Sequence, residues 1–246
     1  MGVLLFILCS LVVGARLMFV YTRLKQPPEL FLGLAYLLAG TLGWGGLLVG
    51  ALKTSPGERV PEAYQAWSVV FGDAGTLCFY LFIWYVFRRQ SAIAKGLVAL
   101  AALAFAVSLV KDTWLTGVTF GPPPGTATTV CGSIGRMVVF PWMAFEAFTQ
   151  YFAFRRRARI GLGNPLVANR LLLWALSAVA MFAISATSTA LYWTAIDAAD
   201  ATAKANRAGG AYGVLALLSS LALWLAFFPP KAYTGWVESA KESSRG

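Results

Sequence analysis

The sequence predicts an all-α polytopic membrane protein, a bundle of seven transmembrane helices, and three observations support that fold class. Seven mainly apolar stretches each reach the ~20 residues that cross the hydrocarbon core of a bilayer. The chain is 59% hydrophobic and 12% charged, whereas soluble domains carry about 25% charged residues. Basic residues and helix breakers gather between the stretches. We therefore expect one seven-helix membrane domain over residues 1–246.

Helix breakers set the boundaries of the predicted elements. Pro27 and Pro28 separate the first two spans, and Arg88–Ser91 alone separates the third from the fourth, so those helices must be antiparallel neighbours. Residues 111–136, which contain a Gly-Pro-Pro-Pro-Gly run, are predicted to form a long outer loop or cap, and Gly209-Gly210 are expected to stop a helix before the last span. The predicted spans are residues 3–22, 30–52, 65–87, 92–110, 137–154, 171–195 and 211–228.

The distribution of the 20 basic residues predicts the orientation. Lys and Arg accumulate in short cytoplasmic loops, and one side of the predicted bundle carries 14 of them against six on the other. The N-terminus is therefore expected outside and the C-terminus inside, in a bacterial inner (plasma) membrane. The net charge of +10 then attracts anionic lipid, and no nucleic-acid partner is expected. The basic residues expected at the inner face include Arg88, Arg89, Arg155, Arg156 and Arg157.

The first stretch lacks a basic leading segment and a small-residue cleavage site, so we expect a retained span and not a signal peptide. Arg16, inside that span, either extends its head group to the inner surface or pairs with an acid in the bundle. Lys111 and Arg136 are expected to be interfacial anchors at span ends. Small residues predict close helix contacts. Gly46 and Gly50 form a GxxxG element that serves packing inside the bundle or, alternatively, a dimer interface.

Two acidic residues fall within the predicted spans, where ionisable groups are candidates for function. They are Asp73 on the third span and Glu146 near the middle of the fifth. A carboxyl at that depth must be protonated, paired or in contact with water. Either the two form a proton-accepting or cation-binding pair open to the outside, or each is a hydrogen-bonded packing element. Each shares a helix face with other side chains, Thr76 and Tyr80 beside Asp73, and Trp142 and Thr149 beside Glu146.

The outer half of the sixth predicted span adds Ser188 and Tyr192 to this set, and Pro141 frees a backbone carbonyl in the fifth. Aromatic walls, a few hydroxyls and two acids are what a site for a small amphipathic or planar ligand needs. The alternative is an aromatic belt at the membrane interface, with hydroxyls bonded to their own helices.

Residues 231–246 follow two prolines that end the last span. Tyr233, Trp236 and Val237 recur at helical spacing among charged residues, a pattern typical of a short amphipathic helix lying in the inner membrane interface. A surface for a cytoplasmic or membrane protein partner is the alternative.

Two families share the predicted topology. Seven spans with an outer N-terminus resemble the microbial rhodopsins and the G-protein-coupled receptors, and Asp73 is similar to the rhodopsin counter-ion. The rhodopsin family also requires a Schiff-base lysine in the seventh helix, and residues 211–228 contain none, so covalent retinal is argued against. Pro229–Tyr233 resembles the receptor motif that ends the seventh helix, without its asparagine. Val86–Arg89 and Phe228–Trp236 resemble recurring features of uncharacterised bacterial seven-transmembrane-helix proteins, a likeness that implies no activity.

The chain contains no histidine. Histidine-ligated zinc and haem sites are therefore argued against, as is a Ser-His intramembrane protease. No catalytic residue and no metal site is predicted, although an enzyme using Asp73 and Glu146 alone stays open. The leading hypothesis is a sensor or receptor-like protein that binds a small molecule in an outer-facing cavity. The alternatives are a transport or proton-relay protein using Asp73 and Glu146, and a non-catalytic subunit of a membrane complex.

Overall fold

A computed structural model describes residues 2–55, 60–110, 127–160, 162, 164–193 and 198–242, and the side chains at 127–131, 159, 191–193, 198–207, 236 and 238–242 lie outside that description. Every element in the described part of the chain is a helix, which confirms the all-α prediction. The elements are α1 (Gly2–Leu24), α2 (Pro27–Ala35), the π-helix η1 (Tyr36–Gly43), α3 (Trp44–Leu52), α4 (Glu62–Phe87), α5 (Ala92–Val110), α6 (Ala127–Arg159), α7 (Pro165–Trp193), α8 (Ala198–Phe227) and α9 (Lys231–Glu242).

Six helical segments are long and apolar enough to cross a membrane, as an integral membrane protein requires: α1, the continuous α2–η1–α3 segment, α4, α5, and the greater parts of α7 and α8. The helix α6 is not among them, although it has 33 residues. Its sequence includes Arg136, Glu146 and Gln150, which lower its hydropathy. It nevertheless packs inside the bundle, against α4, α5 and α7.

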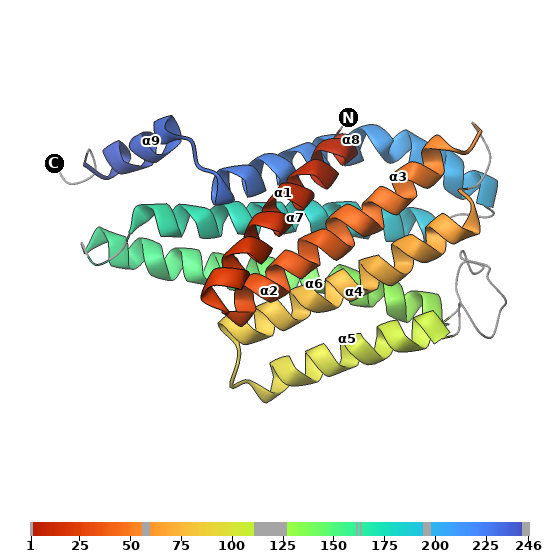
Figure 1. Cartoon of the computed structure of the whole chain (residues 1–246), viewed down its shortest axis with the longest axis horizontal. Coiled ribbons are helices and arrows are strands. Elements are labelled where there is room, and N and C mark those ends of the chain that lie inside the picture. The colour runs from red at the N-terminus through yellow and green to blue at the C-terminus, as the bar shows by residue number, and fades with distance from the viewer. Residues whose placement is uncertain are drawn as a thin grey trace.

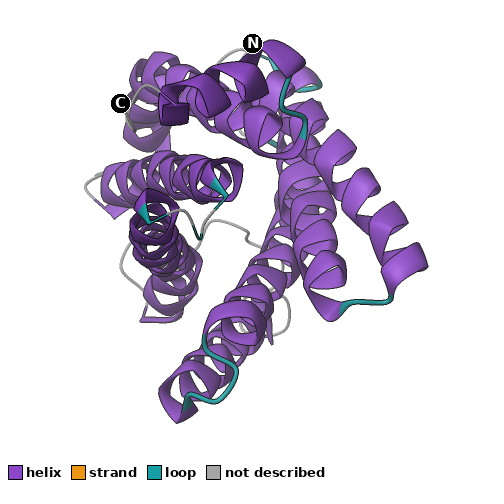
Figure 2. Ribbon diagram, turned by 90° about the vertical axis from the view of Figure 1, so that its left-hand side faces the viewer, coloured by secondary structure: helices purple, strands orange, loops and turns teal. Residues whose placement is uncertain are grey.

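The helices lie side by side in one bundle, with α9 beyond the end of α8 (Figures 1 and 2). The first and last long helices, α1 and α8, pack against each other, and α6, α7 and α8 follow one another as packed neighbours. We call the two ends of the bundle the Leu52 end, which includes Glu62, and the Phe87 end, which includes Leu24 and Ala92 (Figure 1).

The helix α5 lies at the edge of the bundle and packs against α4 and α6 (Figure 1). Its apolar side chains Ile93, Leu100 and Leu103 are 78%, 62% and 61% exposed. Lipid tails solvate such side chains as well as a protein interior does. An exposed apolar face of this size therefore fits a helix that faces a bilayer.

Two predicted boundaries are wrong. The helix α6 begins at Ala127, inside the segment expected to be a loop up to Arg136. Gly132 and Gly135 let it approach α5 closely, because a Cβ at either glycine would lie 2.9 Å from a side-chain atom of Ser108 or Phe105. The other error concerns Gly209-Gly210, since α8 runs through both. Each glycine costs a helix about 1 kcal/mol, which reduces stability without ending the helix.

Small residues bring η1 close to its neighbours. A Cβ at Gly40 would lie 2.5 Å from the Ser10 Oγ of α1, and one at Gly75 of α4 would lie 2.3 Å from the Ala39 backbone nitrogen. Gly46 and Gly50 of α3 face α4 of the same chain. A Cβ at Gly46 would lie 2.6 Å from the Trp67 ring. Among the two uses expected for this GxxxG element, these contacts show packing inside the bundle.

The contact of Gly75 with η1 yields a stability prediction. Gly75→Ala forces α4 and η1 apart and should lower the free energy of unfolding by about 1–3 kcal/mol, as overpacking does in a dense interior. Thermal unfolding of the purified protein in detergent measures the change. The matched control is Gly96→Ala on α5, where no atom lies within 4 Å of the added Cβ. Equal melting temperatures for the two variants would contradict the close α4–η1 contact.

Candidate functional site

Asp73 on α4 and Arg136 on α6 form a two-point ion pair. The Arg136 Nε donates to Asp73 Oδ1 at 2.5 Å, and its Nη2 donates to Oδ2 at 3.2 Å. Asp73 is buried, and the Arg136 side chain keeps about a third of its surface exposed. A forked guanidinium–carboxylate contact fixes the orientation of both groups as well as their distance. Arg136 was expected beside an outer loop at the end of a span, but it lies within α6, which already starts at Ala127. Lys111, for which the same position was expected, lies outside the described residues.

Glu146 on α6 has a different arginine partner. The Arg88 Nε, just beyond the end of α4, donates to Glu146 Oε1 at 2.8 Å, and the Trp142 indole nitrogen donates to the same oxygen at 3.2 Å. Glu146 is buried, whereas the Arg88 side chain is 46% exposed. The hydrogen bond and the negative charge of Glu146 raise the pKa of Arg88. This second ion pair also joins α4 to α6.

The two acids therefore lie in separate ion pairs. Fifteen residues separate Asp73 from Arg88 along α4, which corresponds to roughly 22 Å at the helical rise per residue. The geometry does not bring Asp73 and Glu146 together as one proton-accepting or cation-binding pair. Instead, the two ion pairs connect α4 to α6 at two separate positions along the helices.

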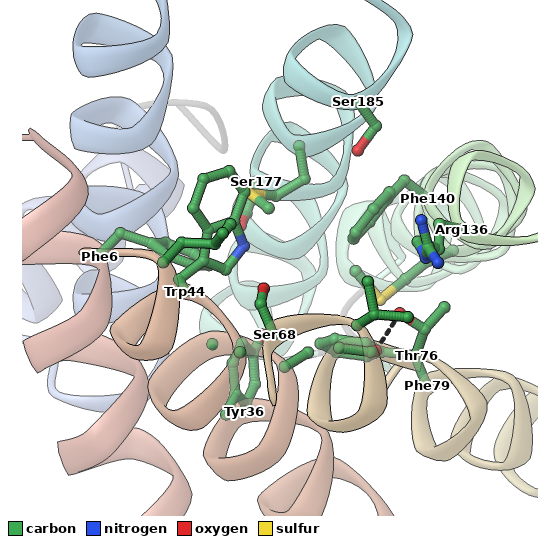
Figure 3. Close-up of a pocket in the computed structure, with 18 of the residues that line it drawn as sticks. Phe6, Tyr36, Trp44, Ser68, Thr76, Phe79, Arg136, Phe140, Ser177 and Ser185 are labelled. Carbon is green, nitrogen blue, oxygen red and sulfur yellow. Dashed lines mark hydrogen bonds between the residues drawn. The ribbon is translucent and has the colours of Figure 1, made fainter. Parts of the chain in front are cut away.

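A cavity of about 530 Å³ lies beside Arg136, toward the Leu52 end (Figure 3). Helices α1, α3, α4, α6, α7 and α8 and the π-helix η1 all contribute to its walls. A π-helix inside a longer helix is frequent at functional sites. The apolar part of the wall includes Phe6, Tyr36, Trp44, Phe79, Phe140 and Met181. The polar side chains in the wall are Gln65, Ser68, Thr76, Arg136, Ser177 and Ser185.

Several of these polar groups already have protein partners. Thr76 donates to the Gly72 carbonyl at 2.7 Å, and the Ser177 and Ser219 hydroxyls lie 2.7 Å apart. Ser68 on α4 and Ser185 on α7 point into the cavity from different helices (Figure 3). The cavity thus combines mostly apolar walls with a few hydroxyls and one guanidinium group.

The structure separates the side chains predicted to form one pocket. Thr76 lines the cavity, and Asp73 holds the cavity residue Arg136. Tyr80 donates to the Gly135 carbonyl at 2.8 Å, and its ring lies 5.8 Å from that of Trp142. Through these contacts, Tyr80 of α4 packs against α6.

Two further predicted pocket residues, Thr149 and Ser188, do not line the cavity. Thr149 is exposed and donates to the carbonyl of Phe145, and Ser188 is exposed on α7. The side chain of Tyr192 lies outside the described residues. Phe6 and Tyr36 line the cavity but were not predicted as cavity residues. The alternation of small and aromatic residues across several helices is the signal that could have found them.

The basic residues predicted at the inner face lie at the Phe87 end, and several stack on aromatic rings. The guanidinium groups of Arg89, Arg155 and Arg157 lie 4.7, 5.9 and 5.6 Å from the ring centres of Tyr85, Tyr151 and Phe154. Arg156 is exposed. Arg16 donates to the Phe227 carbonyl at 2.7 Å and lies over the Phe228 ring, and within the described part of the chain no acid pairs with it.

The helix α9 confirms the predicted helix after the last span. Tyr233 on α9 accepts a hydrogen bond from Asn169 of α7, which ties the helix to the bundle, and the side chain of Trp236 lies outside the described residues. Among the residues that the structure describes, no three Cys, Asp or Glu side chains lie together as a metal site would need.

Comparisons of the chain with protein-family models, with curated proteins and with solved structures found no match. The cavity and the two ion pairs are therefore the features of the molecule that bear on its function.

The Asp73–Arg136 pair yields a double-mutant prediction. Arg136→Gln leaves the buried Asp73 carboxylate without its charged partner and should lower the free energy of unfolding by up to about 3 kcal/mol. This is the lower end of the range for a broken buried pair, because Arg136 is partly exposed. The double variant Asp73→Asn/Arg136→Gln should cost less than the sum of its two single substitutions. Unfolding in detergent measures the four proteins, with Arg89→Gln as an exposed control. Additive effects would contradict the pairing.

Proposed function

We propose that this chain is a sensor or receptor-like integral membrane protein that binds a small amphipathic or planar ligand in the cavity beside Arg136. One observation carries the proposal, the cavity of about 530 Å³ with apolar aromatic walls and a few polar groups. Ligand sites in proteins typically enclose about 300–1,000 Å³ and have this mixture of walls. The aromatic rings accommodate a flat or apolar body, and the hydroxyls and the Arg136 guanidinium offer hydrogen bonds to a polar end.

We propose further that α6 is the seventh span and that the N-terminus faces outward, in a bacterial inner membrane. The packing of α6 inside the bundle supports its place among the spans, since ionisable residues in membrane helices face the bundle interior and pair there. Glu146 is 3% exposed and has an arginine partner. The excess of basic residues toward the Phe87 end supports the orientation. The cavity then opens toward the outside, and the basic face meets anionic lipid or a protein partner.

Occupation of the cavity can be tested directly. Native mass spectrometry and an absorbance spectrum of gently extracted protein should show a bound small molecule in stoichiometric amount. Ser185→Phe fills the cavity and should abolish that mass. The matched control is Ser188→Phe, on the same helix at an exposed position, which should leave the mass unchanged. Equal occupancy in the two variants would place the ligand elsewhere. If gently extracted protein instead holds no small molecule, the two variants will change only the amount of purified protein. That result would favour the interpretation as a non-catalytic subunit of a membrane complex.

Transport is the second candidate function, and one observation favours it. A second cavity of about 540 Å³ lies toward the Phe87 end. The Tyr36 ring, which lines the first cavity, packs there against the Phe227 ring, which lines the second. A solute path through the bundle would connect two such spaces. A proton relay through Asp73 and Glu146 would in addition have to break both ion pairs.

Proton flux distinguishes this candidate from the receptor. Liposomes that contain the protein and an internal pH indicator should take up protons no faster than liposomes without it, because both acids are held by arginines. Glu146→Gln should leave that rate unchanged. Uptake by the wild-type protein that Glu146→Gln abolishes would establish the proton relay and overturn the receptor proposal.

A further inference from the structure

The cavity at the Phe87 end has walls from α1, α2, α4, α6, α7 and α8 and a volume of about 540 Å³. Five aromatic side chains form much of its wall: Phe82, Phe87, Phe154, Trp174 and Phe227. Phe82 and Phe227 each have ring centres 5.6 Å from that of Trp174. Gln150 of α6 supplies an amide group to the wall. The cavity therefore offers a flat apolar body close contact with several ring faces and edges.

An aromatic layer made by Tyr36, Phe79, Trp174 and Phe227 separates this cavity from the one beside Arg136. Tyr36 and Phe79 line the first cavity, and Trp174 and Phe227 line the second. The Tyr36 ring packs edge-on against Phe79 at 5.4 Å and against Phe227 at 6.4 Å between ring centres. The two cavities are thus distinct sites, and the second can be tested without assuming the first.

Glu29 is the one charged side chain in the wall of the second cavity within the part of the chain that the structure describes. Its Oε2 atom is buried without a hydrogen-bond partner, and no ion pair of Glu29 occurs among the described residues. Glu29 lies in the first turn of α2, where the helix dipole favours a negative charge. A carboxylate oxygen that is removed from solvent and left unpaired calls for a donor or a cation.

We propose that the second cavity binds an organic cation, an ammonium or similar charged group carried on an apolar body, with Glu29 as its counter-charge. The carboxylate neutralises the charge, and the aromatic faces attract a cation and bury its apolar body. An anion would meet the repulsion of Glu29. A metal ion such as Ca²⁺ takes six to eight oxygen ligands, whereas this wall offers one carboxylate and one amide group.

The test uses a styrylpyridinium dye, a planar cation, and its uncharged styrylpyridine parent, both titrated against the full-length protein in nanodiscs of phosphatidylglycerol. The wild-type protein should bind the cation more tightly than the neutral parent. Glu29→Gln should lower the affinity for the cation about tenfold or more and leave that for the parent unchanged, because only the cation loses a charge-assisted contact.

Glu62→Gln is the matched control, since Glu62 is an exposed glutamate in the first turn of α4 at the other end of the bundle. It removes the same charge and should leave both affinities unchanged. Trp174→Leu should weaken both ligands through the lost ring contacts, which keeps the proposal testable if Glu29→Gln fails to fold. Equal cation affinity in the wild type and Glu29→Gln, or an equal loss for both ligands in Glu29→Gln, would overturn the assignment.

The natural cation can come from a phospholipid headgroup or from a free organic cation, because both carry an ammonium on an apolar body. Addition of phosphatidylethanolamine to the nanodiscs distinguishes these sources. Competition with the dye assigns the site to the lipid headgroup, and full retention of dye binding assigns it to a free cation. Both results uphold the ammonium site. The cavity-filling variant Ser185→Phe should leave dye binding intact, so failure of the first cavity and failure of the second are separate results.

Discussion

The ion pair between Asp73 and Arg136 is the interaction on which the arrangement of α4 and α6 depends. A carboxylate that is 6% exposed in a helix apolar enough to cross a membrane has to be compensated. The forked contact compensates it and holds the guanidinium group at the cavity wall. The Glu146–Arg88 pair compensates the second buried acid, near the Phe87 end. With its acid thus paired, α6 can keep a low hydropathy and still lie inside the bundle.

Close packing and open space occur side by side around η1. η1 meets α1 at its own Gly40 and α4 at Gly75 of that helix, and neither contact leaves room for a side chain at the glycine. The aromatic side chains of the same region, Tyr36, Phe79, Trp174 and Phe227, form a layer across the bundle. This layer is bounded on each side by a cavity of more than 500 Å³. The proposed ligand site and the proposed cation site both depend on it, because each uses its rings as a wall.

The fold class could be predicted from the sequence because apolar length and basic loops are properties of single segments. The site could not be predicted as well, since it depends on contacts between segments. Asp73 and Glu146 stand out as acids in apolar spans, but nothing local indicates which arginine each one meets. Arg136 was misplaced because the start of α6 was predicted too late. The phase of a helix also matters, since Ser185 lines the cavity while Ser188, three residues later, is exposed.

The central claim is that Asp73 is an ionised carboxylate held by Arg136, and infrared spectroscopy of the reconstituted protein tests it most directly. With carbon-13 in the aspartate side chains, the difference spectrum between wild type and Asp73→Asn isolates the signal of Asp73. We expect an ionised carboxylate band to be lost in Asp73→Asn, and the same band of Asp73 to shift when Arg136 is replaced by Lys. A protonated carbonyl band in that difference spectrum, unaffected by Arg136→Lys, would contradict the account.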